Sequence, residues 1–189
     1  MGGEISLVIS NRLGAGGLSI AQNAGIETAL IDHQRYPTRE AFDQDLAGAI
    51  DSAQPDLVVL AGFMRILTPE FVARFSERLM NIHPSLLPLY PGLHTHQRAL
   101  DNGDSHAGAT VHYVTGELDG GPPVLQAKVP VNSGDDADAL AARVLAMEHQ
   151  IYPVAINWHL CGRLTWEDGS LMKDGMPVPP SGELWESTS

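Results

Sequence analysis

The sequence predicts an α/β fold with a doubly wound, mostly parallel sheet and flanking helices. Two observations support this fold class. Short apolar runs of strand length alternate with segments whose apolar residues recur at helical spacing. The spacing also suits right-handed crossovers between parallel strands. With 189 residues and 43% hydrophobic content, the chain is expected to form one domain, residues 1–189, with a C-terminal hairpin and tail over about 169–189.

The first half of the chain alternates regularly between strand and helix patterns. Thr38 is a good N-cap for a helix, and Thr68, Pro69 and Glu70 supply the cap, the first-turn proline and the first-turn acid of another. The predicted strands are 4–10, which is expected to be buried, 26–31, 56–60 and 79–82, and the predicted helices are 18–24, 39–53 and 69–78.

The second half departs from this alternation. Residues 94–102 predict a helix that ends at Asn102 and Gly103. Residues 109–115 and 123–131 both alternate like strands, so they predict an antiparallel excursion around a loop over 116–121. A long helix is expected to begin at 133–135, with apolar residues at helical steps as far as Ala155.

The composition excludes several classes of protein. Lys and Arg number 11 against 23 Asp and Glu, giving a net charge of −12 and no basic stripe for nucleic acid. Such a balance does not exclude a local site for an anionic small molecule. Cys161 is the only cysteine and is expected to be a buried structural thiol. No signal peptide or spanning segment is recognisable, so we expect a cytoplasmic protein without membrane contact.

Asn81 and His83 are the main candidates for chemistry. They are two residues apart at the end of a predicted strand, so both should face the cleft beyond the carboxyl ends of the sheet. Asn can donate to an oxyanion, and His can act as acid, base or cation. Three prolines stiffen the following loop, and Ser85 could orient the ring. The alternative is that both are ordinary polar loop residues.

Other candidates depend more strongly on the fold. Asp119 could fix an imidazole, but an Asp-Gly pair is also ordinary turn chemistry. His94 and His96 lack a metal-binding pattern, so no metal is expected. The glycines at 14–17 lie where a phosphate loop would lie, without its full spacing, and a flexible start to a helix explains them equally well.

Arg65 lies among apolar residues at another strand end. It could reach a carboxylate ligand, and its neighbours Met64, Ile66 and Leu67 could line a slot for a flat ring. Alternatively, these residues cover the next helix and Arg65 is solvated. Their spacing does not decide between the two readings.

Three segments together carry a family resemblance. VVLAGFMRIL, MNIHPSLLPLYPGLHTH and ELDGGPPVLQAKVPV resemble the phosphoribosylglycinamide formyltransferases, folate-dependent enzymes of purine synthesis, over about residues 6–179. Related enzymes that act on methionyl-tRNA or hydrolyse formyl-folate share the Asn-x-His and Ser-x-Leu-Pro core. They differ in the PGLHTH loop and carry an additional domain, for which there is no room here.

The resemblance implies roles for particular residues. Asn81, His83 and Asp119 match the family's catalytic trio, and Glu148 matches a carboxylate that holds the substrate's ribose hydroxyls. The positions that match the formyl-folate contacts are Arg39, Met64, Arg65, Ile66, Leu67 and Asn81. The implied substrates are glycinamide ribonucleotide and 10-formyltetrahydrofolate, handled without a metal by a monomer or homodimer.

The chain departs from the family pattern at its start. Family members begin with a further strand, a Gly-Asn-Gly-Ser-Asn-like phosphate loop and a helix, and this chain is expected to be N-terminally truncated by that unit. The resemblance therefore implies catalytic residues without full substrate affinity. A folate-binding domain without turnover and a formyltetrahydrofolate hydrolase remain as alternatives.

Overall fold

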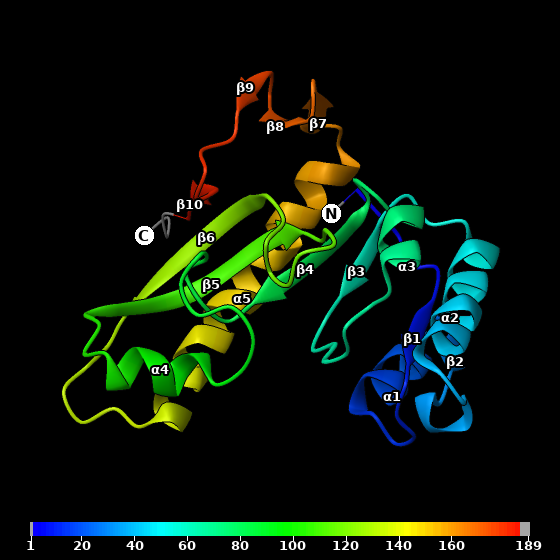
Figure 1. Cartoon of the computed structure of the whole chain (residues 1–189), viewed down its shortest axis with the longest axis horizontal. Coiled ribbons are helices and arrows are strands. Elements are labelled where there is room, and N and C mark those ends of the chain that lie inside the picture. Colours follow the sequence, from blue (N-terminus) through cyan, green and yellow to red (C-terminus); the bar gives the residue numbers. More distant parts are fainter. Residues whose placement is uncertain (1, 186–189) are drawn as a thin grey trace.

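The main sheet has five strands in the order β10–β6–β5–β4–β3 (Figure 1). The computed structural model describes residues 2–185. Strands β3 and β4 are parallel, as are β6 and β10, whereas β5 is antiparallel to both β4 and β6. The strands are β3 (Val58–Leu60), β4 (Leu79–His83), β5 (His106–Tyr113), β6 (Pro123–Pro130) and β10 (Glu183–Leu184).

Two smaller sheets complete the strand inventory of the described residues. The first is a parallel pair, β1 (Val8–Ser10) and β2 (Thr28–Leu30), and the second is antiparallel, with β7 (Leu164–Glu167), β8 (Ser170–Lys173) and β9 (Met176–Pro177). The predicted α/β class is confirmed, and so is the antiparallel excursion through β5 and β6.

The helices begin where the sequence supplies a cap. The Thr38 hydroxyl accepts from the Ala41 amide, the Thr68 hydroxyl from the Phe71 amide, and the Asp136 carboxylate from the Ala139 amide. The helices are α1 (Gly16–Asn23), α2 (Arg39–Ala53), α3 (Pro69–Arg74), α4 (Thr95–Asp101) and α5 (Ala137–Leu160), with a short 3₁₀ turn at His33–Arg35.

Strand β4 lies between two apolar clusters. Leu79 belongs to the first, which joins α2, α3 and β3, and Met80 belongs to the second, which joins α5, β5 and β6. Figure 1 shows α5 lying along β5 and β6, with α2 and α3 on the other side of the molecule. The strand that carries Asn81 and His83 is therefore fixed from both sides.

Several predicted boundaries and environments were wrong. The strand predicted over 4–10 is only Val8–Ser10 and is half-buried, and the helix predicted to run to 78 stops at Arg74. Cys161 is exposed because it follows the last residue of α5, at the helix end. The hairpin predicted after residue 169 is present as β8 and β9, and the unpredicted strand β7 precedes it from Leu164. Strand β10 pairs with β6, and residues 186–189 of the predicted tail lie outside the described residues.

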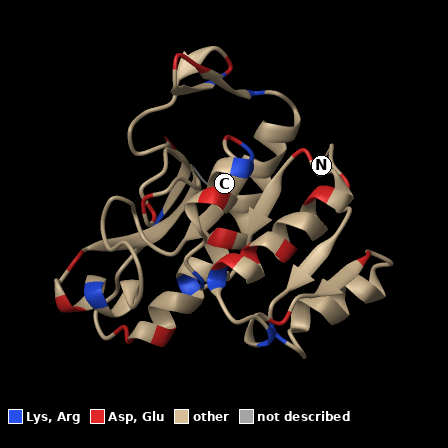
Figure 2. Cartoon of the chain, turned by 45° about the vertical axis from the view of Figure 1, so that its right-hand side comes forward, with Lys and Arg blue, Asp and Glu red and all other residues tan. Residues whose placement is uncertain are grey.

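Carboxylates outnumber cationic groups on the helices and loops (Figure 2). Over residues 2–185, no helix combines the length and the apolar character needed to cross a membrane.

Candidate active site

Asn81 and His83 project from the carboxyl-terminal half of β4. Residues two apart on a strand share a face, so the two side chains lie on the same side of the sheet. In the ladders, Asn81 is opposite Leu60 of β3 and His112 of β5. His83 is buried, with 6% exposure, whereas Asn81 is half-buried.

Both ring nitrogens of His83 face oxygen atoms of the protein. Nε2 lies 2.9 Å from the backbone oxygen of Tyr90, and Nδ1 lies 3.5 Å from Oδ2 of Asp119. A carbonyl oxygen can only accept, so Nε2 carries a proton. A doubly protonated ring would donate to one oxygen and form an ion pair with the other.

Asp119 reaches this place through the loop between β5 and β6. Its Oδ2 also accepts from the Gly92 amide at 2.8 Å, and its side chain is 10% exposed. The loop folds tightly against the end of β5, because a Cβ on Gly121 would lie 1.8 Å from the Tyr113 oxygen. The amide, the imidazole and the carboxylate proposed from the sequence therefore lie together, although 36 residues separate His83 from Asp119 along the chain.

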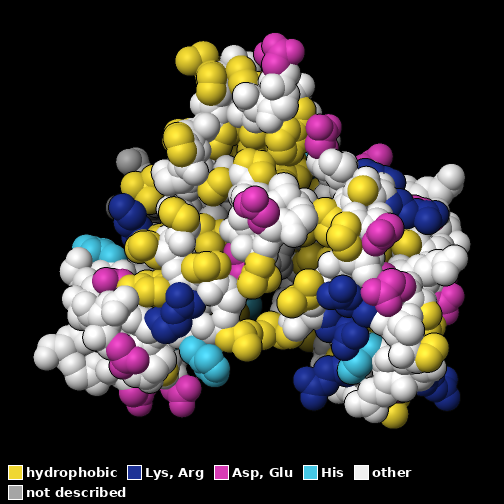
Figure 3. Space-filling model, in the orientation of Figure 1, with side chains coloured by type: hydrophobic (Ala, Val, Ile, Leu, Met, Phe, Trp, Pro, Cys, Tyr) yellow, Lys and Arg dark blue, Asp and Glu magenta, His cyan; other side chains and the backbone are white. Residues whose placement is uncertain are grey.

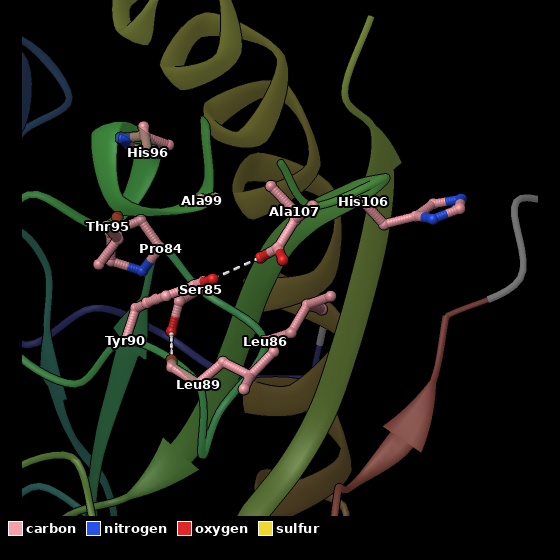
Figure 4. A pocket seen from close by; sticks show the side chains of 11 residues that line it. Pro84, Ser85, Leu86, Leu89, Tyr90, Thr95, His96, Ala99, His106 and Ala107 are labelled. Atoms are coloured by element: carbon pink, nitrogen blue, oxygen red, sulfur yellow. Dashed lines mark hydrogen bonds between the residues drawn. The ribbon is translucent and has the colours of Figure 1, made fainter. Parts of the chain in front are cut away.

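The proline-containing loop after β4 is held by its own side chains. Ser85 was predicted to orient His83, but its hydroxyl donates to the Leu89 oxygen at 2.5 Å. The hydroxyl of Tyr90 donates to Asp104, and Figure 4 shows both bonds around a cavity of about 10 Å³. Such a volume suits a single water at most. These bonds anchor the loop, and the backbone oxygen of Tyr90 faces the His83 ring.

His112 was missed by the sequence analysis. Its Nε2 lies 3.3 Å from Nδ2 of Asn81 and 3.9 Å from Oδ1 of Asp119. Burial lowers the pKa of His112, the Tyr113 backbone and Asp119 act in the opposite direction, and His83 lowers it further. The available signal was a histidine in a strand of mostly apolar or small residues, a pattern that equally suits an ordinary core position.

The residues matched to formyl-folate contacts lie at the start of α2 and in the segment that follows β3, the strand paired with β4. Arg39 opens α2, and the guanidinium of Arg65 stacks over the Phe42 ring, one turn along the same helix, at 5.0 Å. Met64 and Ile66 are large apolar side chains with 74% and 64% exposure, while Leu67 packs on the cluster around α2. In the orientation of Figure 1, the space-filling view shows hydrophobic side chains around a hollow in the front face of the molecule (Figure 3).

Glu148 lies on α5, half-buried. Burial raises the pKa of its carboxyl, and the charges of His149 and His83 act in the opposite direction. The two histidines lie on different elements, His149 beside Glu148 on α5 and His83 on β4.

The remaining candidates from the sequence contribute differently. His94 adopts a positive φ of 59° at the start of α4, and His96 has a buried Nε2 for which residues 2–185 offer no hydrogen-bond partner. In the same range, no set of three or more His, Cys, Asp or Glu side chains is arranged to hold a metal ion. Gly16 and Gly17 form the first residues of α1.

An amide and an imidazole on an interior strand of an α/β fold, with a carboxylate from a neighbouring loop, fit a group-transfer enzyme. The Formyl transferase family profile matches residues 1–156, and the chain belongs to that family.

Individual relatives make the comparison more specific. The chain is 53% identical over 180 residues to the phosphoribosylglycinamide formyltransferase of Escherichia coli, covering 95% of this chain and 85% of that protein. The enzyme of the same name from Haemophilus influenzae is 45% identical over 179 residues, covering 95% and 84%. The solved phosphoribosylglycinamide formyltransferase of Coxiella burnetii superposes with a TM-score of 0.92 at 46% identity, covering 97% of this chain and 86% of that one.

Proposed function

We propose that the protein transfers a formyl group from 10-formyltetrahydrofolate to the amine of glycinamide ribonucleotide, a step of de novo purine biosynthesis. The observation that supports this most directly is the grouping of Asn81, His83 and Asp119 at one strand end. The relatives that carry this activity in their names cover nearly the whole chain.

In the proposed reaction, the amine lone pair attacks the formyl carbon and the carbonyl electrons move to oxygen. Asn81 donates a hydrogen bond to the resulting oxyanion, and a protonated His83 stabilises it through its positive charge. Asp119 forms an ion pair with the cationic ring and positions a water. That water carries a proton from the attacking amine to the folate nitrogen, which leaves with the electrons of its bond to the formyl carbon.

Neighbouring residues would bind the two substrates. Arg39 and Arg65 are suited to the carboxylates of the folate, and Met64, Ile66 and Leu67 to its flat ring. Glu148 would accept hydrogen bonds from the ribose hydroxyls. We further infer a cytoplasmic enzyme that acts on small molecules as a monomer or homodimer, without a metal.

The test is a formyl-transfer assay on the purified chain, with both substrates, for the wild type and for Asn81→Ala and His83→Ala. Loss of one oxyanion donor typically costs about 10²–10³ in rate. We expect each variant to lose at least that much in kcat while remaining folded by circular dichroism. Near-normal turnover of His83→Ala would overturn the role given to His83.

Other outcomes distinguish the alternatives. Binding of a folate analogue without any turnover would indicate a folate-binding domain. Formate release in the absence of glycinamide ribonucleotide would indicate a hydrolase, in which water replaces the amine. Either result would contradict the proposed transfer.

A further inference from the structure

The side chain of His112 is placed directly against Asn81. The two residues are partners in the antiparallel ladder between β4 and β5, so their side chains leave the sheet on the same face. His112 is 2% exposed, and the β5–β6 pairing shifts register between Val111 and His112. Register irregularities of this kind re-aim a side chain next to a site.

The hydrogen bonds of His112 define its tautomer. Nδ1 lies 2.9 Å from the Tyr113 oxygen, which can only accept, so Nδ1 carries the proton of the neutral ring. Nε2 is then a bare acceptor, and it lies 3.3 Å from Nδ2 of Asn81. The reversed amide would place Oδ1 of Asn81 against the same lone pair, where two acceptors repel each other.

The surroundings keep the ring in this state. Burial lowers the pKa of His112 and favours the neutral form. The charged or titratable groups that act on it are Asp119, whose Oδ1 is 3.9 Å away on the β5–β6 loop, and His83 on β4. A neutral ring accepts one N–H bond of Asn81 and leaves the second free for a ligand.

We propose that His112 is a positioning residue, which accepts a hydrogen bond from Asn81 and thereby directs the other N–H of that amide at the reacting carbonyl. The proposal rests on the proposed function for its catalytic consequence. The hydrogen bond itself can be tested without turnover.

The kinetic test compares two substitutions of His112. His112→Leu removes the acceptor, and we expect kcat to fall about 10- to 100-fold, because a misaligned donor loses much of the value of an oxyanion contact. KM for both substrates should change by no more than about twofold, since the lost interaction belongs to the transition state. His112→Gln retains a carbonyl acceptor and should recover most of kcat.

Two controls separate positioning from loss of structure. Val129→Ala removes a buried group from β6, away from the site, and should lower Tm while leaving kcat unchanged. In an Asn81→Ala background, His112→Leu should cost nothing further in kcat, because the two residues act as one unit. Additive losses, or a wild-type kcat in His112→Leu, would overturn the proposal.

Heteronuclear NMR of the ligand-free wild type gives an independent readout. We expect a nitrogen–nitrogen coupling across the bond between Asn81 Nδ2 and His112 Nε2, with His112 protonated at Nδ1. A protonated Nε2 without this coupling would overturn the positioning role alone. Absence of formyl transfer by the wild type, with the coupling present, would overturn the proposed function instead.

Discussion

Asn81 and His83 differ in whether the protein already engages all of their hydrogen-bond donors. One N–H of Asn81 is directed at His112, and the other has no hydrogen-bond acceptor among residues 2–185. Both ring nitrogens of His83 face protein oxygens, on Tyr90 and Asp119. In the proposed reaction, unless one of these contacts is exchanged, His83 would act on a substrate through its charge and Asn81 would be the direct donor.

Arg65 and Glu148 are each proposed to bind a different substrate, so their variants should affect different KM values. If they contact different substrates, Arg65→Ala raises KM only for formyl-folate, and Glu148→Gln raises KM only for glycinamide ribonucleotide. Hydrogen bonds to charged groups contribute about 1.5–3 kcal/mol, so each KM should rise about 10- to 100-fold. Steady-state kinetics with each substrate varied in turn measures this, and each variant serves as the control of the other. A rise in both KM values for either variant would contradict the separate assignments.

Among the structural elements, the loop between β5 and β6 has the most demanding geometry. Gly121 leaves no room for a side chain, because its Cβ would meet the Tyr113 backbone, and Asp119 has a positive φ of 50°. The position of the carboxylate next to His83 thus depends on a close backbone contact two residues away.

Gly121→Ala tests this dependence, and Gly116→Ala in the same loop is its matched control. A Cβ on Gly116 would meet nothing within 4 Å in the described structure. Since the Tyr113 backbone must shift, Gly121→Ala should destabilise the protein by about 1–3 kcal/mol, as overpacking does elsewhere. It should also lower kcat, because Asp119 moves with the loop. Urea denaturation and the formyl-transfer assay measure both effects, and equal behaviour of the two variants would refute the explanation.

Local signals predicted the elements better than the site. Helix α2 was predicted at both ends, because Thr38 caps its start and Pro55 follows its end by two residues. Asp119 was a candidate from its chemistry, but only the family resemblance grouped it with Asn81 and His83, since a tight turn gives no indication of which distant strand it meets. His112 was missed because a histidine within a mostly apolar strand forms no recognisable pattern, and its proposed role depends on the register with Asn81.

Across the whole molecule, one buried and two half-buried histidines link stability to pH. Burial lowers the pKa values of His96, His112 and His159 below the ordinary value of 6.5. Below pH 6.5, the unfolded chain binds protons that the folded chain does not. The contribution of these histidines to the free energy of unfolding therefore has its full value above about pH 6.5. It decreases as the pH drops towards the pKa values of the histidines in the folded chain. Glu148, whose pKa is raised, acts in the opposite direction at pH values nearer to its ordinary 4.5.

Urea denaturation at about pH 7.5, 6.5 and 5.5 should show this loss, with a slope of at most about 1.4 kcal/mol per pH unit for each histidine. His159→Gln should reduce the slope between the two lower pH values. His106→Gln, at an exposed position, should leave it unchanged. A free energy of unfolding that is constant over this range would contradict the linkage.

The position of β4 between the two apolar clusters has a consequence for quality control in the cell. Neighbouring residues of this one strand, Leu79 and Met80, complete different halves of the interior. A chain in which only one half has consolidated cannot present Asn81 and His83 correctly. Formyl-transfer activity would then require the fully folded chain, and partly folded intermediates would be inactive.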